Sequence, residues 1–397
     1  MGMKFCLTGC LLLPILLFCL AGCSSNSHSS TTGISFLYVT AQANTTISAY
    51  TVTQSTGALT TVGSAVATGS VPVAVAVTPT GSALFVANSG SNNISTYTIN
   101  SDGSLAAVSG TTSTGSTPVA LAVDSGGKFL FVANQASSDI SVFSISGTGL
   151  TPVAGSPFTT IPVGFSYPNG TLPAAVAVSA SGKFLYVANQ LANFVSAFSI
   201  NSTSGALSPL PVPFYDDGQT SPSGLAVTPN GGFLYVTNAG ANSNNVSAYA
   251  ICDNVVNSCT NPTTPDGTLT AVTGSPFPAG LGPVAIAFDP GFSFAYVVDK
   301  GSNTISQYSY GPESGVLTPL SPGTISTGVT PVSIAVLPGV VLADVGNTLF
   351  NTTDYAYVAN LGAGTISVFS LTTSTGLLNV VGQPIVIFGQ TSAVLGR

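Results

Sequence analysis

The string Tyr186-Val187-Ala188-Asn189 decides the fold, because close copies of it return along the whole chain. Each copy has an aromatic residue, then Val, then a small residue, and usually ends in Asn. A repeat of roughly this length, built from strand-like segments, is typical of a β-propeller. The copies are 46 to 61 residues apart and begin at Tyr38, Phe85, Phe131, Tyr186, Tyr235, Tyr296 and Tyr357.

Three other short strings recur around these aromatic-Val-x-Asn strings. Upstream lies a Pro followed by alternating Val and Ala, as in Pro72–Val77. Downstream comes Ile-Ser-x-aromatic, as in Ile94–Tyr97, and then a Leu close to a Gly, as at Leu105. All four strings are short, rich in β-branched and aromatic residues, and bounded by Gly, Asn, Ser and Pro, which is typical of strands. We therefore expect four strands in each repeat, named A, B, C and D in chain order.

The two ends of the repeat region are expected to complete one blade together. The chain holds seven copies of the B, C and D strings but only six of the A string, and its first repeat opens in a B strand at residues 34–39. Residues 391–395 follow the last D string and are predicted to supply the missing A strand. The sequence thus predicts an all-β fold over residues 34–397: a seven-bladed β-propeller of four-stranded antiparallel blades, closed by its C-terminal strand. Closure leaves no free edge strand at the junction, so we expect a monomer.

These strings resemble those of the YVTN-repeat and lactonase-type seven-bladed β-propellers, a group that includes 6-phosphogluconolactonase-like proteins. The resemblance covers the chain from about residue 34 onward. It implies the propeller fold, and it raises hydrolysis of a sugar lactone as a candidate activity. The shared strings build strands and turns rather than a reaction centre, so the resemblance by itself assigns no catalytic residue.

The first residues are typical of an export signal. Residues 11–20 form an apolar core, and Leu20-Ala21-Gly22-Cys23 resembles the bacterial lipobox. We expect residues 1–22 to be a lipoprotein signal peptide and Cys23 to be lipidated, whereas an ordinary secretory signal is the alternative. Residues 23–33 are then a flexible polar tether. The expected location is the cell envelope of a bacterium, with the propeller lipid-anchored to a membrane and facing the periplasm or the cell surface.

Two cysteines remain beyond the expected lipidation site. Cys252 and Cys259 are close in sequence, and an exported chain with two remaining cysteines is expected to join them in a disulfide. A metal pair is the alternative, but no His or further Cys stands near them to complete a ligand shell.

The chain is unusually poor in charge, with 5 Lys and Arg against 12 Asp and Glu and a net charge of −7. Nucleic-acid binding depends on basic side chains that neutralise phosphates, and this sequence cannot assemble a basic patch. We therefore expect no nucleic-acid partner.

Candidate binding residues gather in connections that share one face of the expected propeller. The D–A connections at residues 159–172 and 211–221 carry Tyr167 and Tyr215, and the Asp299-Lys300 pair lies in a B–C turn. Because B–C and D–A connections leave a blade at the same end, we expect these side chains on one face. Lys300 is a candidate for binding an anionic sugar or phosphate, and a simple surface pair with Asp299 is the alternative.

Asp216 and Asp217 are adjacent carboxylates in the second of these connections. Such a pair can share a proton or bind a hard cation, and it is the weak candidate for a catalytic or ligand-binding role. A solvated turn is the alternative, since Asp-Asp-Gly is favourable turn chemistry. No metal site or cofactor is predicted, and a divalent cation has no further support.

Lactone hydrolysis requires a base that activates water and a group that stabilises the oxyanion. The one His of the chain, His28, lies in the expected tether, and the one Glu, Glu313, lies in a turn. The sequence therefore predicts a binding or scaffold module for a glycan, a peptide or a protein rather than an enzyme. An exported 6-phosphogluconolactonase-like sugar lactone hydrolase is the alternative.

Overall fold

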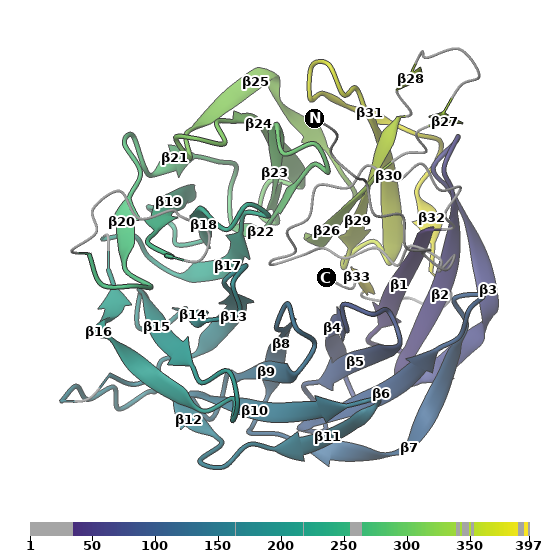
Figure 1. Cartoon of the computed structure of the whole chain (residues 1–397). Helices are drawn as coiled ribbons and strands as arrows, with labels where there is room; N and C mark the ends of the chain where they lie inside the picture. The colour runs from purple at the N-terminus through teal and green to yellow at the C-terminus, as the bar shows by residue number, and fades with distance from the viewer. Residues whose placement is uncertain are drawn as a thin grey trace, which may run out of the picture.

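A closed ring of seven blades accounts for most of the residues that the computed structural model describes. The described residues are 35–162, 164–216, 218–254, 264–338, 342–343, 349–350, 353–387 and 393–395. The blades stand around a central axis, and the purple N-terminal blade lies beside the yellow C-terminal one (Figure 1). The predicted seven-bladed propeller with four-stranded antiparallel blades is confirmed. Among the described residues, no helix combines the length and the apolar character that crossing a membrane requires.

Each blade is an antiparallel sheet whose four strands follow one another outward from the axis (Figure 1). The inner A strands, from the first blade to the seventh, are β33 (Ala393–Leu395), β4 (Pro72–Val77), β8 (Pro118–Val123), β13 (Pro173–Val178), β17 (Pro222–Val227), β22 (Pro283–Phe288) and β26 (Pro331–Leu337). The B strands are β1 (Ser35–Ala41), β5 (Ala83–Asn88), β9 (Phe129–Asn134), β14 (Phe184–Asn189), β18 (Phe233–Asn238), β23 (Phe294–Asp299) and β29 (Asp354–Asn360).

The C strands are largely buried, and the outermost D strands are the most exposed. The C strands are β2 (Thr46–Thr53), β6 (Asn93–Ile99), β10 (Asp139–Ser146), β15 (Phe194–Ile200), β19 (Asn245–Ile251), β24 (Thr304–Tyr310) and β30 (Thr365–Leu371). The outermost D strands are β3 (Ala58–Ala67), β7 (Leu105–Ser113), β11 (Gly149–Pro152) with β12 (Phe158–Thr159), β16 (Leu207–Tyr215), β20 (Leu269–Ala271) with β21 (Phe277–Pro278), β25 (Leu317–Ser326), and β31 (Leu378–Val380) with β32 (Ile385–Val386). A small hairpin, β27 (Leu342–Ala343) and β28 (Leu349–Phe350), is inserted between β26 and β29.

The two ends of the chain close the ring as the sequence predicts. Strand β33 pairs antiparallel with β1, placing Ala393 opposite Ala41 and Leu395 opposite Val39. The first blade therefore takes its inner strand from the C-terminus and its other three strands from the N-terminal repeat.

The aromatic residue of the repeated string links most blades to the next one by a hydrogen bond. In five blades a Tyr of the B strand donates a hydrogen bond to the backbone carbonyl of a Gly in the C–D turn of the following blade. In the other two blades the position is Phe, which has no hydroxyl. The bonds are 2.6 to 3.1 Å long and join Tyr38 to Gly103, Tyr186 to Gly267, Tyr235 to Gly315, Tyr296 to Gly376 and Tyr357 to Gly57.

The apolar core lies between blades rather than at one centre. Burial of apolar surface is the main favourable term in folding, and every cluster of buried side chains draws on neighbouring blades. One cluster joins Leu37 and Tyr50 of the first blade to Tyr357 and Ile366 of the seventh. The same contacts that stabilise each blade thus also hold the ring shut.

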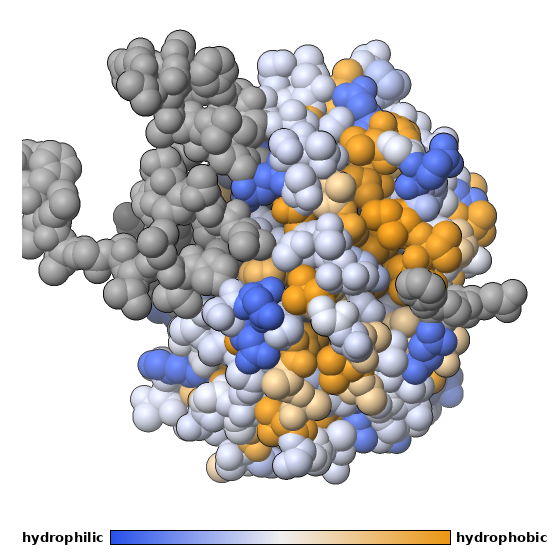
Figure 2. Space-filling model, turned by 90° about the vertical axis from the view of Figure 1, so that its right-hand side faces the viewer, coloured by the Kyte–Doolittle hydropathy of each residue, from blue (hydrophilic) through white to orange (hydrophobic). Residues whose placement is uncertain are grey.

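The outer wall of the ring reflects the composition of the chain. Figure 2 shows the side on which β3 lies in Figure 1, where orange apolar areas alternate with pale, weakly hydrophilic ones and few blue residues appear. Only 4% of the residues are charged, so the polarity of this wall comes mainly from uncharged side chains.

Candidate functional site

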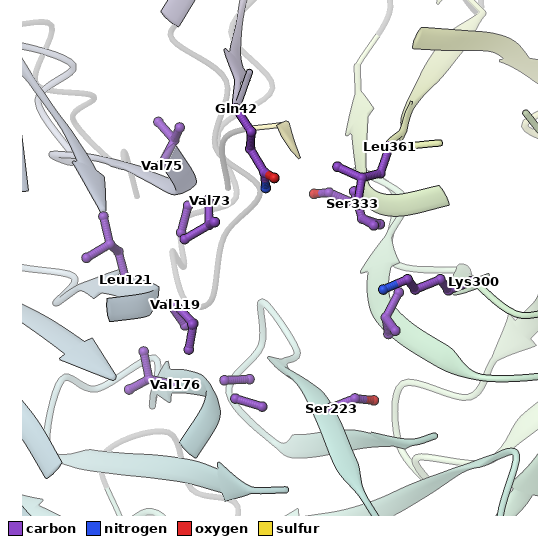
Figure 3. A pocket seen from close by; sticks show the side chains of 16 residues that line it. Gln42, Val73, Val75, Val119, Leu121, Val176, Ser223, Lys300, Ser333 and Leu361 are labelled. Carbon is purple, nitrogen blue, oxygen red and sulfur yellow. The ribbon is translucent and has the colours of Figure 1, made fainter. Parts of the chain in front are cut away.

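A cavity of about 350 Å³ lies on the propeller axis, enclosed by the inner strands of the blades. Its walls come from three successive levels of the A strands, and its rim comes from B–C turns (Figure 3). We call this the mouth cavity, and the face formed by the B–C and D–A connections the mouth face. Its size falls within the range of small-molecule sites, although at the lower end.

The repeated A strand explains the chemistry of the cavity wall. Each A strand except β33 opens with a Pro that is buried, and the next residue faces the channel and is partly exposed. Since side chains alternate along a strand, this position is set by the Pro-Val-Ala-Val pattern of the repeat. It is Val in four of the six described cases; the residues are Val73, Val119, Ala174, Ser223, Val284 and Val332.

A strained turn precedes each of these prolines. The residue before the Pro has a positive φ of 50 to 60°, a backbone conformation that is uncommon for residues other than Gly. Its carbonyl accepts a hydrogen bond from the backbone N–H that follows the B strand, as from Ser89 to Val71 at 2.9 Å. The D–A connection and the B–C turn of one blade are thereby tied together around the channel. The residues are Val71, Thr117, Leu172, Ser221, Gly282 and Thr330.

Lys300 is the one charged residue among the described residues that line the cavity. It follows β23 in a B–C turn, where its backbone N–H donates to the carbonyl of Gly282 at 2.9 Å. Its side chain is exposed and extends its Nζ toward the middle of the cavity, across from Val119 (Figure 3). Lys183, by contrast, forms a 3.1 Å ion pair with Asp266. Lys300 is therefore placed to meet an anionic or hydrogen-bond-accepting group of a ligand.

Asp299, predicted as a ligand-binding partner of Lys300, lies below the cavity surface instead. Its side chain is fully buried, and Oδ2 accepts hydrogen bonds from Ser306 Oγ at 2.7 Å and Thr304 Oγ1 at 3.2 Å. Oδ1 is buried and has no hydrogen-bond partner within the described part of the chain. Burial raises the pKa of this carboxyl to about 6, against a partial lowering by the two hydroxyl donors.

The Asn residues at the same position in other blades have a structural role. Their Nδ2 groups donate to a Ser hydroxyl of the neighbouring C strand, for example from Asn134 to Ser141 at 2.8 Å. All are buried, so this ring of amides does not line the channel. The residues are Asn88, Asn134, Asn189, Asn238 and Asn360.

Tyr167 lies in an aromatic cluster that joins its D–A connection to strands β15 and β16. Its ring centroid is 5.4 Å from that of Phe194, which is 5.3 Å from Phe214; Phe165 packs edge-on against Phe214 at 5.1 Å. Aromatic pairs favour such tilted and edge-to-face arrangements. Phe214 and Tyr215, predicted in the second D–A connection, belong to strand β16 instead, and none of the four clustered residues lines the mouth cavity.

The side chains of Tyr215 and Asp216 lie in different surroundings. The Tyr215 hydroxyl accepts a hydrogen bond from the backbone N–H of Leu269 at 3.0 Å, and its ring packs 6.3 Å from that of Tyr249. Burial raises the pKa of Tyr215, so the phenol stays protonated and links two blades. Asp216 is exposed, and its Oδ1 accepts a hydrogen bond from the N–H of Gly218 at 2.9 Å. This is the geometry of a solvated turn, and Asp217 lies outside the described residues.

The remaining predicted sites are only partly covered. Cys252 is buried directly after β19, the C strand of the fifth blade. Cys259 and the expected lipidation site Cys23 lie outside the described residues, as do residues 1–34. The Cys252–Cys259 disulfide stays a prediction. Within the described ranges, no three His, Cys, Asp or Glu side chains gather in a way that would hold a metal ion.

Sequence reasoning found Lys300 but missed most of the cavity. Gln42 and Leu361 occupy the same repeat position as Lys300, directly after the end of the B strand, and both line the rim (Figure 3). The residues after the channel prolines were also missed. Both sets recur once per repeat, so aligning the repeats by their Pro and Asn positions would have found them.

The fold and the cavity together define a class of protein: a β-propeller with a ligand-sized cavity on its axis. The sequence profile described as lactonase, 7-bladed beta-propeller, matches residues 28–102, 70–156, 154–257 and 253–386. The chain belongs to this family, as the repeat strings predict. A comparison with curated protein sequences found no significant match.

Solved structures with the same fold include three of named proteins. A candidate 6-phosphogluconolactonase from Bacteroides uniformis is 20% identical, with a TM-score of 0.73 over 91% of this chain and 98% of that one. A second candidate 6-phosphogluconolactonase, from Bacteroides fragilis, is 19% identical, with a TM-score of 0.74 over 93% and 99%. The periplasmic gluconolactonase of Pseudomonas aeruginosa is 18% identical, with a TM-score of 0.71 over 91% and 99%. At these identities the likeness establishes the fold alone.

Proposed function

We propose that this protein is a binding module that holds a small ligand in the mouth cavity, with Lys300 as the contact for the polar end of that ligand. The observation that carries the proposal is an axial cavity of about 350 Å³ into which one ammonium group projects. A site of this kind supplies a shaped wall and one placed charge, which are parts that ligand recognition needs.

The residues around the cavity favour binding over hydrolysis. A hydrolase acting on a lactone needs a base within hydrogen-bond reach of the attacking water. The described lining holds Lys300 but no carboxylate and no imidazole. Asp299 is adjacent in sequence, yet its carboxyl is buried and one of its oxygens already accepts two hydroxyl donors. Asp216 lies on an exposed turn away from the lining.

Hydrolysis of a sugar lactone is the second candidate, and family membership favours it. The profile that matches the chain is that of lactonases, and the three structural neighbours carry lactonase names. In this case Lys300 would polarise the carbonyl or hold the anionic product, and a group outside the described lining would have to activate water.

One assay separates the two candidates. We would follow proton release from glucono-δ-lactone and 6-phosphogluconolactone in a pH-stat, using the full chain with and without Ca²⁺. Binding alone predicts hydrolysis at the spontaneous rate in every condition. Hydrolysis above that rate that is lost in Lys300→Met, but kept in Lys128→Met, would establish a lactonase instead. Lys128 is a suitable control because it is exposed, follows an A strand and does not line the cavity.

We further propose that the propeller is tethered to the bacterial cell envelope through lipid on Cys23, facing the periplasm or the cell surface. The lipobox-like string Leu20-Ala21-Gly22-Cys23 supports this proposal. Metabolic labelling with radioactive palmitate should mark the wild-type protein in a bacterial host and should not mark Cys23→Ala. Equal labelling of both proteins, or of neither, would overturn the anchor.

A further inference from the structure

We propose that the outer corner of the fourth blade, on the mouth face, is a docking surface for a partner protein that brings an apolar side chain together with an Arg or a Lys. The surface is separate from the mouth cavity, and the inference does not depend on the proposed function. We call it the blade-4 patch. It consists of Phe165, Leu191, Val212 and Phe214, backed by Tyr167 and Phe194.

An unusually long D–A connection builds the patch. It joins β12 to β13 over residues 160–172, and it carries Phe165 and Tyr167. Long loops in a compact fold are usually functional, because binding residues concentrate on loops that a rigid scaffold positions. The repeat itself requires much less chain at this place, since four other D–A connections are far shorter: residues 68–71, 114–117, 279–282 and 327–330.

The base of this connection is fixed to the third blade, whereas its tip is exposed. Thr160 is buried and donates its N–H and its Oγ1 to the carbonyl of Ser138 at 3.1 and 2.8 Å. Thr171 is also buried, and its N–H donates to Ser138 Oγ at 3.0 Å. At the tip, the N–H of Phe165 closes a turn onto the carbonyl of Pro162 at 3.2 Å. A partner therefore meets a loop that is already held in shape, which lowers the entropy cost of binding.

The exposed apolar side chains of the patch gather at one corner of one blade. Phe165 is 52% exposed and packs edge-on against Phe214. Val212 lies two residues before Phe214 on β16 and is 40% exposed. Leu191 is 47% exposed, and its N–H donates to a carbonyl at the base of the connection at 3.1 Å. Such groups of exposed aromatic and large aliphatic side chains are typical of protein interfaces.

Charge selects the kind of partner. Asp216 is exposed directly after β16, two residues beyond Phe214. Between Lys128 and Lys300 the only other cation is Lys183, and both Lys128 and Lys183 lie in A–B turns at the opposite end of their blades. A guanidinium can stack on an aromatic ring and also pair with a carboxylate. An exposed ring beside a carboxylate therefore favours a partner segment in which a basic residue accompanies an apolar one.

A second copy of this chain is a poor partner for the same reason. The whole chain has only 5 Lys and Arg. Lys183 is paired with Asp266, and Lys300 extends into the mouth cavity. Among the cations in the described part of the chain, this leaves Lys128. We therefore infer that the occupant is a segment of a different protein.

Selection from a phage-displayed library of random peptides, carried out on the full chain, tests the partner chemistry. Peptides that also bind the Phe165→Ser variant are removed by counter-selection. The peptides that remain should share an Arg or a Lys within about two positions of an aromatic or large aliphatic residue, because aromatic anchors and Arg dominate interface energies.

Calorimetric titration with one selected peptide assigns the binding to the patch. Phe165→Ser should weaken binding about tenfold or more, because it removes the exposed anchor. Asp216→Asn should weaken it about two- to fivefold and reduce its dependence on salt, as expected for the loss of an exposed ion pair. Val386→Ser is the matched control and should change nothing, since Val386 is 72% exposed but lies on the seventh blade.

The contrary outcomes separate the surface from its partner. An empty selection, or selected peptides that lose binding in Lys300→Met, would show that the blade-4 patch is not a docking surface. Phe165-dependent peptides without basic residues, or equal binding to wild type and Asp216→Asn at low salt, overturn the stated partner chemistry. Co-sedimentation of the full chain with phosphatidylcholine vesicles that is lost in Phe165→Ser assigns the patch to a lipid surface and overturns the protein partner.

Discussion

At the scale of single residues, the B-strand terminus shows how one repeated position takes on different tasks. Five blades end this strand in a neutral amide that donates to a Ser of the C strand. The sixth places Asp299 there, and Ser306 reverses its role and donates to the carboxylate. The change puts an acid in a buried pocket built for an amide, which is why its pKa rises.

Asp299 makes stability depend on pH in a direction that can be checked. Its pKa is about 6 in the folded protein against 3.8 for the unperturbed group, so the folded state holds the proton over a wider range. The free energy of unfolding therefore falls as pH rises from about 4 to about 6, by about 3 kcal/mol from this group. Asp299→Asn should remove that fall and make the variant more stable than wild type at pH 7.5. Urea denaturation of both proteins at pH 4.5 and pH 7.5 measures it.

The contrary result is equally clear. If the stability difference between Asp299→Asn and wild type were the same at both pH values, the carboxyl would titrate normally in the fold. Asn134→Asp is the reverse variant, since it places an acid at the matching position of another blade, and it should lose stability as pH rises.

At the scale of the element, the C–D turns show why glycine recurs in the fourth string. All seven turns hold a Gly with a positive φ, and in six of them a Cβ at the same place would collide with an aromatic ring from the preceding blade. Gly315 has a φ of 71° and lies against the ring of Phe233. The turn thus reverses the chain within its own blade and also forms the surface against which an aromatic ring of the preceding blade packs.

Gly315→Ala should therefore destabilise the protein by more than conformational strain alone. A positive φ costs Ala about 1 kcal/mol, and displacing Phe233 adds an overpacking cost of about 1–3 kcal/mol. Gly147→Ala is the matched control, because Gly147 has a φ of 59° with nothing within 4 Å of an added Cβ. Denaturation midpoints of the two variants compare them directly. Equal losses would mean that the ring of Phe233 moves aside without cost.

At the scale of the whole molecule, closure depends on contacts between the two ends of the chain. Strand β33 covers the inner edge of β1, and Tyr357 of the last blade donates to Gly57 of the first at 2.9 Å. A ring of blades opened at this junction would present the free edge of β1, and free edges pair with other chains.

Removing the closing strand should make the protein self-associate. A chain that ends at Ser392 lacks β33, whereas one that ends at Leu395 keeps it and serves as the control. We expect the first to elute early and broadly on size-exclusion chromatography and to unfold at lower temperature. The second should match the full chain. Monomeric behaviour of both truncations would show that β33 is not needed to protect the edge.

The repeat strings predicted more of the fold than of the site. Each string carries its own local pattern of alternating apolar residues, so strand number, order and closure could be worked out without any long-range information. The site predictions failed where direction mattered. Asp299 and Lys300 are neighbours in sequence, yet one side chain is buried and the other reaches the cavity. Tyr215 and Asp216 diverge in the same way.

By itself the sequence determined a seven-bladed ring, its closure by the C-terminal strand, and the family to which the chain belongs, because these follow from patterns that repeat within each blade. Only the tertiary structure decided which side chains line the cavity on the propeller axis. The mouth cavity is built from one to three residues of every blade, and no single repeat contains it. Whether a side chain such as Lys300 faces that shared space, or turns away from it like Tyr215, depends on the packing of neighbouring blades.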